Sequence, residues 1–249
     1  MTTAPFYGGD IRRKALWDLA AGLPVAVLVA AATWSLLDVT ATYGLRVLGL
    51  YAAASVLILA TVPDDLPGPG SGPANRVTLG RLILLLCIAG LAPTGGALGV
   101  TGRWWVIGLG TAIMMLDGVD GWMARRTSTA TPFGARFDME TDALLMLVLS
   151  VLVWTEGRAG AWVLLIGAMR YLFVAAGWVV TRLRADLPPS LRRRVVCVVQ
   201  GIALLVCLGP IVPADMAVAA AAVGLAALAW SFGADVTWLL RARPPERGA

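Results

Sequence analysis

Histidine is absent from the 249-residue sequence, and lysine occurs only once, as Lys14. The absence of histidine excludes Ser-His-Asp triads, histidine general bases and histidine metal ligands. The three cysteines, Cys87, Cys197 and Cys207, lie in apolar runs and form no CxxC pair, so neither a zinc site nor a disulfide framework is indicated. Charged residues make up only 14% of the chain, whereas soluble domains average about a quarter. This scarcity of charge argues against a soluble protein.

Apolar residues take the place of the missing charges. They make up 59% of the chain, and the mean hydropathy is +0.80. A soluble helical protein with a very apolar core is the alternative, but several apolar runs are near 20 residues long, the length of a transmembrane helix. We therefore expect an all-α polytopic membrane protein with about eight transmembrane helices, at 15–37, 43–62, 75–94, 103–125, 134–155, 160–184, 191–211 and 215–241.

The basic residues are distributed unevenly around these segments. With the N-terminus in the cytoplasm, sixteen of the twenty basic residues fall on or near the cytoplasmic side. This positive-inside pattern predicts a multi-pass protein of the cell membrane with both termini in the cytoplasm. The first segment follows Arg12, Arg13 and Lys14. We interpret it as a retained helix, and a signal peptide is the alternative reading.

A Pro- and Gly-rich linker, PDDLPGPGSGPA, divides the chain. Its residues cannot continue a helix. The expected organisation is a two-helix membrane hairpin at 1–62, the linker at 63–74 and a six-helix domain at 75–249. Because the motif described next lies wholly in the six-helix domain, deletion of residues 1–70 is expected to leave the chemistry intact.

Four aspartates, Asp117, Asp120, Asp138 and Asp142, lie in two consecutive apolar segments. Each ionised carboxylate in a spanning helix costs roughly 2.5–3.5 kcal/mol on insertion scales, and the four also repel one another. Such a cluster requires cations or proton uptake. The alternative is a set of helix-cap and interfacial acids without a ligand.

Helical spacing places the four aspartates on two rungs. Asp117 and Asp142 lie roughly 12 Å inward from the cytoplasmic ends of their helices, and Asp120 and Asp138 about 6–8 Å inward. Packed antiparallel helices lie about 8–10 Å apart, so the carboxylates can meet between them. An all-oxygen set suits Mg²⁺, Mn²⁺ or Ca²⁺ better than zinc. Two such ions about 4 Å apart would suit phosphoryl chemistry.

The aspartates belong to a longer motif. DGVDGWMAR, at 117–125, is followed after eight residues by GARFDMETD, at 134–142. This resembles the signature of the CDP-alcohol phosphatidyltransferase family, DxxDGxxAR-x8-GxxxDxxxD, and every defining position is filled. The resemblance covers residues 74 to 245 and implies a six-helix core. ANRVTLGR, at 74–81, is similar to the first core helix of the family, with Arg81 at the NxxTxxR spacing.

The resemblance also implies roles for individual residues. The four aspartates, Asp117, Asp120, Asp138 and Asp142, would hold two divalent cations, Mg²⁺ or Mn²⁺, and Asp142 would be the general base. CMP would leave as an acceptor hydroxyl attacks the phosphorus distal to cytidine. The residues expected to bind the CDP moiety are Asn75, Thr78, Gly121, Ala124, Arg125, Thr131 and Gly134. Gly121 and Ala124 could equally serve close helix packing.

The acceptor is expected among arginines. Arg170 lies in the middle of a predicted span, where a lone arginine is usually functional. The residues expected to bind a phosphorylated alcohol are Arg136, Arg170, Arg193 and Arg194, with Arg192 beside them. For the last three, setting the topology is an equal alternative. Members that use phosphorylated acceptors commonly carry a basic residue after the last aspartate, where this chain has Ala143.

The predicted reaction transfers a phosphatidyl group from CDP-diacylglycerol to a small, phosphorylated alcohol. The alternative within the family transfers a headgroup phosphate from a CDP-alcohol to a lipid hydroxyl such as diacylglycerol. A cation transporter is a more distant alternative, and a catalytically inactive scaffold is a third. The expected partners are these substrates, membrane lipids and a second copy of the chain in a homodimer, with no nucleic acid.

Overall fold

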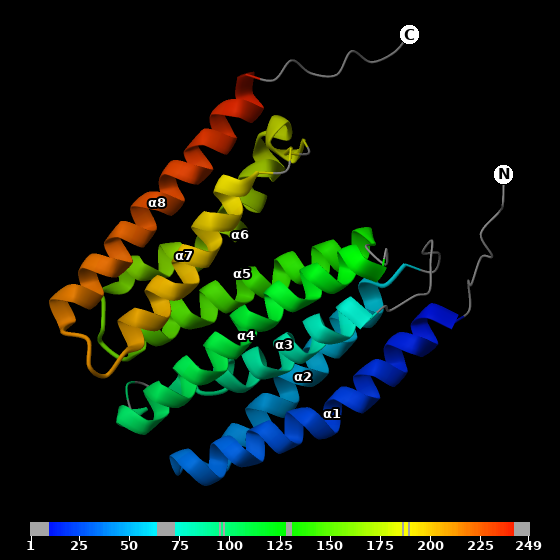
Figure 1. Ribbon diagram of the computed structural model, residues 1–249, viewed down its shortest axis with the longest axis vertical. Helices are drawn as coiled ribbons and strands as arrows, with labels where there is room; N and C mark the ends of the chain where they lie inside the picture. The colour runs from blue at the N-terminus through cyan, green and yellow to red at the C-terminus, as the bar shows by residue number, and fades with distance from the viewer. Residues whose placement is uncertain are drawn as a thin grey trace. The chain divides into compact units, whose positions relative to one another are not determined.

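The computed structural model describes residues 10–63, 73–94, 96, 98–127, 131–185, 187–188 and 190–241, and at residues 10, 73 and 119–127 it describes the backbone alone. The described residues form helices and no strand (Figure 1). The α-helices are α1 (Asp10–Leu37), α2 (Thr42–Thr61), α3 (Pro73–Ala89), α4 (Gly99–Thr127), α5 (Pro132–Thr155), α6 (Leu164–Val179), α7 (Leu191–Leu208) and α8 (Ala214–Arg241). Three short 3-10 helices are η1 (Ala92–Thr94), η2 (Ala161–Val163) and η3 (Thr181–Arg184).

The expected all-α polytopic membrane fold is confirmed. Among the described residues, α1, α2, α3, α8 and the segment formed by η2 and α6 are long and apolar enough to cross a membrane. The remaining long helices are α4, α5 and α7. Their charged residues include those assigned to function above: Asp117 in α4, Asp138 and Asp142 in α5, and the arginines at the start of α7.

Two helices end earlier than the sequence indicates. The third predicted span reaches residue 94, but α3 ends at Ala89 and is followed by a turn and η1. Gly90 lies against the hairpin there, since a methyl group on it would lie 2.8 Å from Val47 Cγ2. The sixth predicted span, 160–184, divides into η2, α6 and η3. Apolar composition sets the length of a span, whereas these local turns depend on contacts that composition does not show.

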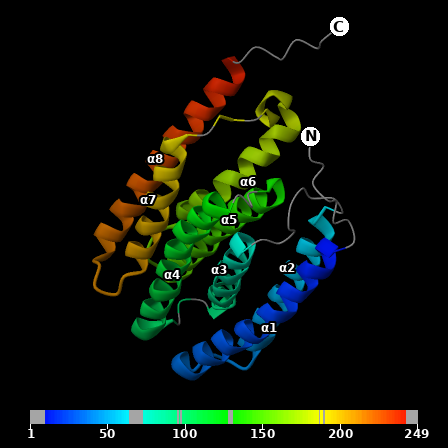
Figure 2. The ribbon, with the colours of Figure 1, turned by 45° about the vertical axis from the view of Figure 1, so that its right-hand side comes forward.

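The chain forms two compact units, residues 1–148 and 149–249, and α5 runs from one into the other. In the first unit α3 is the central helix. Its residues Leu82, Ile83, Leu85, Leu86 and Ile88 are all nearly or completely buried. It packs along α4 and against the α1–α2 hairpin, residues 10–61, and Figure 2 shows these helices from a second direction. Helix α3 is therefore held on several sides.

Hydrogen bonds fix the α1–α2 hairpin to α3 at several levels. The Tyr43 hydroxyl donates to the Cys87 carbonyl oxygen at 3.0 Å, and Arg46 Nη1 donates to the Gly90 carbonyl oxygen at 3.3 Å. Near the other end of α3, Arg76 Nε donates to Asp18 Oδ1 at 2.9 Å. Within the hairpin, the Tyr51 hydroxyl donates to the Leu19 carbonyl oxygen at 2.6 Å. Because hydrogen bonds are strong in an apolar medium, these contacts hold the α1–α2 hairpin in position against α3.

The second unit is organised around the α7–α8 hairpin, residues 191–241. Gln200 Nε2 donates to the Gly224 carbonyl oxygen at 2.7 Å, and this bond links the two helices. Arg158 donates to the carbonyl oxygens of Cys207 at 2.8 Å and Gly209 at 3.3 Å. The last carbonyls of a helix have no partner within it, so Arg158 caps the C-terminal end of α7.

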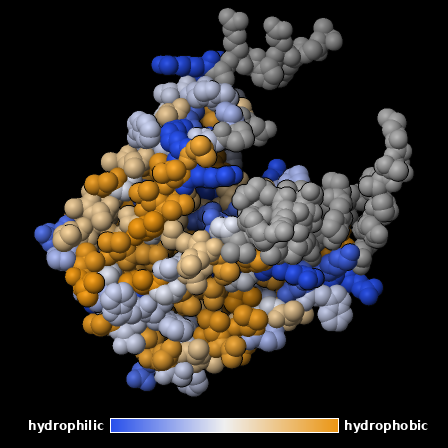
Figure 3. Space-filling view, viewed as in Figure 1, coloured by the Kyte–Doolittle hydropathy of each residue, from blue (hydrophilic) through white to orange (hydrophobic). Residues whose placement is uncertain are grey.

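The exterior of the helices is apolar. Large side chains such as Leu28, Leu45 and Val179 are 70%, 72% and 85% exposed. Hydrophobic residues cover much of the face seen in Figure 3. A soluble monomer rarely exposes so much contiguous apolar surface, but a helix that faces lipid does. The surface therefore agrees with the membrane fold.

Candidate metal and substrate site

The acid cluster, Asp117, Asp138 and Asp142, is centred on Arg81. Arg81 Nη2 lies 2.9 Å from Asp117 Oδ1 and also bonds Asp142 Oδ1, while Arg81 Nη1 bonds Asp138 Oδ1. Asp117 comes from α4, Asp138 and Asp142 from α5, and Arg81 from α3. Asp117 and Asp142 share one nitrogen of Arg81, as expected for two residues on one rung. Three helices thus meet at one guanidinium.

Burial distinguishes Arg81 from the acids around it. The Arg81 side chain is 1% exposed, whereas those of Asp117, Asp138 and Asp142 are 38%, 39% and 28% exposed. The guanidinium is therefore enclosed behind carboxylates that remain accessible. With all four groups ionised, three negative charges and one positive charge leave a net charge of −2. A cluster with that charge in a low-dielectric protein attracts a cationic ligand.

The donor set fits a hard divalent cation. One carboxylate oxygen from each of Asp117, Asp138 and Asp142 lies within 4.8 Å of the others. Carboxylate oxygens suit Mg²⁺, Mn²⁺ and Ca²⁺, and within the described part of the chain no softer ligand belongs to this cluster. One divalent cation would balance the net charge of −2. The cluster can therefore hold a metal.

Four of the predicted site residues lie where only the backbone is described. Asp120, Gly121, Ala124 and Arg125 all belong to the last turns of α4, and their side chains lie outside the described residues. Their helical backbone continues the face that carries Asp117, at the spacing of a regular helix. Their roles stay predictions.

Three predicted CDP-binding residues come together beside the acid cluster. A methyl group on Gly134 would lie 2.5 Å from Asn75 Oδ1 and 3.2 Å from Thr131 Oγ1. Glycine at this position leaves room for the Asn75 side chain of α3 beside α5. Thr131 Oγ1 accepts a hydrogen bond from the Gly134 amide at 3.0 Å, and Pro132 follows it as the first residue of α5. Thr131 therefore caps α5, in addition to any contact with a ligand.

Thr78 lies one helical turn from Asn75 and is almost completely buried. Its hydroxyl donates to the Ala74 carbonyl oxygen at 3.2 Å within α3. Asn75, Thr78 and Arg81 follow one another at intervals of three residues, so they progress along one side of α3 towards the acid cluster. Their binding roles stay predictions, and the helix orders them in a single row.

The predicted acceptor-binding arginines are divided between the two units. Arg136 is exposed on α5, Arg170 is half-buried in α6 and Arg194 is exposed on α7. Arg193 Nη1 lies 3.2 Å from Asp235 Oδ1, and its Nη2 donates to the Pro188 carbonyl oxygen. Arg193 is thus engaged in a structural contact within the second unit. The assembly of these arginines into one acceptor site stays a prediction.

Two charged residues have a larger structural part than the sequence indicated. The sequence marks Arg81 only by its spacing, yet it bonds all three described carboxylates. The signal for Arg81 is an arginine at depth on the helix that precedes the motif. An acid beyond the first turn of the apolar helix α8, as Asp235 is, gives a signal of the same kind. Asp235 bonds both Arg192 and Arg193.

Comparison with known proteins agrees with this geometry. The family model described as CDP-alcohol phosphatidyltransferase matches residues 72–232, about two thirds of the chain. The matched range begins just before α3, ends within α8 and contains the whole acid cluster. No curated protein and no solved structure matches the chain. The family supports phosphatidyl transfer in phospholipid synthesis, with CDP-alcohol substrates and a general dependence on divalent cations. The chain belongs to the CDP-alcohol phosphatidyltransferase family, and it is a multi-pass membrane transferase of that type.

Proposed function

We propose that the protein transfers the phosphatidyl group of CDP-diacylglycerol to the hydroxyl of a small, phosphorylated alcohol and releases CMP. One observation carries the proposal: Asp117, Asp138 and Asp142 converge on Arg81 within the range matched by the family. A diphosphate is strongly anionic, so an acidic site can bind it only together with cations. The accessible carboxylates and the family's cation dependence support this pairing.

Asp117, Asp120, Asp138 and Asp142 would hold two divalent cations, Mg²⁺ or Mn²⁺. When bound, the cations would neutralise the diphosphate and the developing charge on the departing phosphate. Asn75, Thr78 and Thr131, with Gly121, Ala124, Arg125 and Gly134, would form the surface against which the CDP moiety lies. The contact between Asn75 and Gly134 supports this assignment, because it brings α3 and α5 together beside the acids.

Asp142 would act as the general base. Its carboxylate takes the proton of the acceptor hydroxyl as the hydroxyl oxygen forms a bond to the phosphorus distal to cytidine. The bond from that phosphorus to the bridging oxygen breaks, and CMP departs with the electron pair. Arg81 holds one Asp142 oxygen and thereby orients the carboxylate. A positioned carboxylate of this kind typically contributes about 10²–10⁴-fold to the rate.

Arg136 supports an anionic acceptor, because it is exposed on α5 two residues before Asp138. Arg170, Arg193 and Arg194 remain candidates for binding the acceptor, as the sequence predicts. A second candidate is the transfer of a headgroup phosphate from a CDP-alcohol to diacylglycerol. Ala143 favours this second candidate. It is buried, and it occupies the position at which members with phosphorylated acceptors commonly carry a basic residue. The site and both termini would face the cytoplasm, in line with the positive-inside pattern.

CMP release by the purified protein in detergent tests the proposal. CDP-diacylglycerol is supplied with Mg²⁺ or Mn²⁺, and glycerol 3-phosphate, inositol phosphate, inositol and serine are added one at a time. We expect one acceptor to stimulate CMP release and chelation of the metal to abolish it. Asp142→Asn serves as the inactive control, since it removes the base and keeps the shape of the side chain.

Two other results would support a different function. CMP release only from CDP-choline or CDP-ethanolamine, with diacylglycerol as acceptor, would establish the second candidate. Metal binding by a folded protein that releases no CMP from any CDP donor would contradict both candidates. Uptake of a divalent cation into proteoliposomes, measured on the same preparation, would then establish a transporter.

A further inference from the structure

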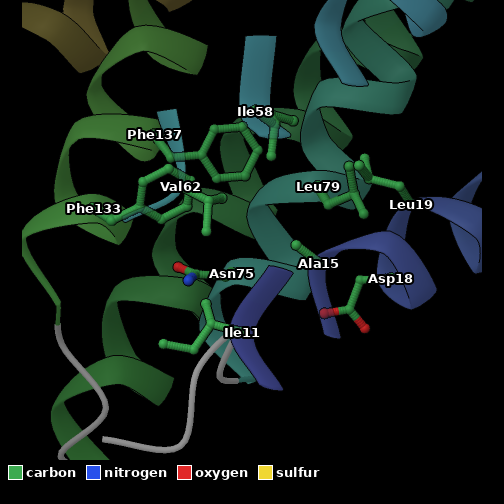
Figure 4. Close-up of a pocket in the computed structure, with 10 residues that line it drawn as sticks. All are labelled: Ile11, Ala15, Asp18, Leu19, Ile58, Val62, Asn75, Leu79, Phe133 and Phe137. Carbon is green, nitrogen blue, oxygen red and sulfur yellow. The ribbon is translucent and has the colours of Figure 1, made fainter. Parts of the chain in front are cut away.

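A pocket lies between the α1–α2 hairpin and helices α3 and α5 (Figure 4). Its lining is mainly apolar, with Ala15 from α1, Ile58 from α2 and Val62 directly after it, and Phe133 and Phe137 from α5. Among the described residues, the polar ones that line it are Asp18 and Asn75. Six of its ten lining residues precede residue 72, where the match to the family begins. The pocket thus depends on a hairpin that the family model does not include.

The pocket and the acid cluster share two helices. On α5, Phe133 and Phe137 line the pocket, and each is followed directly by a residue of the adjacent face, Gly134 and Asp138. Successive residues of a helix point about 100° apart, so the two faces meet along one edge. On α3, Asn75 both lines the pocket and touches Gly134. A ligand can therefore occupy both places without leaving the surface of α5.

We propose that this pocket holds one acyl chain of the lipid donor, beside the site that binds its diphosphate. The inference rests on the proposed function, since it takes the donor to be CDP-diacylglycerol. Such a donor is an amphiphile, and its apolar and anionic parts are joined through a short glycerol. A lining of phenylalanine and aliphatic side chains suits a hydrocarbon chain, whereas a nucleobase would leave hydrogen-bonding groups without partners.

An ion pair borders the pocket. Asp18 is bonded to Arg76, whose side chain is 66% exposed and follows Asn75 in the chain. An exposed guanidinium beside the pocket is complementary to an anionic phosphate of the donor. The hydrogen bonds from Tyr43 and Arg46 to α3 hold the hairpin wall in place.

A substitution that fills the pocket tests the proposal in the full-length protein. Ala15→Phe adds an aromatic ring where Ala15 is 7% exposed, whereas Ala20→Phe adds the same ring at an exposed position of α1. The preference for a dioleoyl over a dihexanoyl CDP donor is measured as the ratio of the two kcat/KM values. We expect Ala15→Phe to lower this ratio about tenfold, equivalent to losing the burial of about two methylene groups. Ala20→Phe is expected to leave it unchanged. Equal ratios in the wild type and both folded variants would overturn the proposal.

Photocrosslinking of the wild-type protein tests occupancy without any substitution. CDP-diacylglycerol and phosphatidylcholine, each with a diazirine in one acyl chain, are compared by mass spectrometry of the labelled peptides. We expect the CDP probe to label pocket residues of α2 and α5, and excess unlabelled CDP-diacylglycerol to suppress the labelling. Equal labelling of the pocket by phosphatidylcholine would assign it to bulk lipid and overturn the proposal.

The two readouts separate failure of the inference from failure of the proposed function. Competitive labelling of the pocket without CMP release from any donor would support the lipid pocket and contradict the proposed reaction. CMP release without labelling of the pocket would support the proposed reaction and contradict the lipid pocket.

Discussion

The two units of the molecule each contain a cluster of arginine and aspartate, with opposite proportions. In the first unit one arginine, Arg81, bonds three aspartates from two other helices. In the second unit one aspartate, Asp235, bonds two arginines, Arg192 at 2.5 Å and Arg193 at 3.2 Å. Both clusters join residues of different helices. Their net charges differ, at −2 for the first and +1 for the second when every group is ionised.

The surroundings of the two clusters differ as well. In the second unit the surplus of positive charge has neutral partners. Arg192 also donates to the Ser231 carbonyl oxygen and lies over the Trp230 ring at 5.6 Å, and Arg193 donates to the Pro188 carbonyl oxygen. In the first unit the three acids are partly exposed, and a single arginine leaves their negative charge unbalanced. A buried ion pair is therefore suited to a ligand when its charge is unbalanced and accessible, and to joining helices when neutral groups complete it.

The same substitution in both clusters gives the sharpest test, and the largest effect is expected at Asp142. Asp142→Asn removes the proposed base and one negative charge, so kcat for CMP release should fall by about 10³-fold. Metal-dependent CDP binding should be partly retained, because Asp117 and Asp138 remain. CMP release and isothermal titration with a CDP ligand measure the two properties. Undiminished turnover would remove Asp142 as the base.

Arg81→Gln tests whether the acids need an internal counter-charge. Without Arg81 the three carboxylates face one another with a net charge of −3, and breaking a buried ion pair typically costs about 3–5 kcal/mol. Thermal unfolding in a metal chelator should therefore occur well below that of the wild type, and added Mg²⁺ should restore part of the difference. The kcat/KM with Mg²⁺ should fall about 100-fold, because the carboxylates lose their orientation. The lower unfolding temperature and the lower kcat/KM would have the same cause, the loss of the Arg81 guanidinium.

The control for Arg81→Gln is Arg103→Gln, which removes an exposed guanidinium that donates to the Gly99 carbonyl oxygen at the start of α4. It should change neither property appreciably. Equal unfolding of Arg81→Gln and the wild type in the chelator would contradict the counter-charge role.

The fold was largely predictable because one physical rule sets it. Apolar runs long enough to cross a bilayer become helices, and all eight predicted spans correspond to helices whose ends shift by a few residues. The meeting of Asp117, Asp138 and Asp142 was predictable for a related reason, since helical spacing and an antiparallel turn fix which residues share a level. Both inferences use only distances along the chain.

Contacts between distant segments were not predictable in this way. Nothing in the local pattern around Arg81 indicates that it fills the space between α4 and α5, and nothing around Asp18 or Tyr43 indicates a bond to α3. The hairpin was therefore expected to be dispensable. Its hydrogen bonds to α3, the helix that carries Arg81, give the opposite expectation for a deletion of residues 1–70.

Asp235→Asn breaks the second cluster and should affect stability more than turnover, because Arg192 and Arg193 themselves remain. Hydrogen bonds to charged groups contribute about 1.5–3 kcal/mol each, and both arginines would lose their anionic partner. The unfolding temperature should fall, while CMP release per folded molecule stays within about twofold of the wild type. Asp215→Asn is the matched control, because Asp215 is exposed in the first turn of the same helix. A loss of CMP release comparable to that of Asp142→Asn would show that Asp235 belongs to the site and that the contrast between the clusters is mistaken.

The smallest effect is expected at Asp18 and Arg76, whose ion pair joins the α1–α2 hairpin to α3. Arg76 is mostly exposed, and exposed pairs contribute only about 0–1 kcal/mol. Asp18→Asn, Arg76→Gln and the double variant form a cycle in which the coupling free energy of unfolding should be below about 1 kcal/mol. Asp18 lines the apolar pocket and Arg76 is its ion-pair partner, so the same cycle on KM for CDP-diacylglycerol carries more information. If Arg76 faces the donor phosphates, Arg76→Gln should raise KM by about threefold, and Asp18→Asn should not, because it frees the guanidinium for the substrate. Equal increases in both single variants would mean that the pair acts only by holding the hairpin against α3.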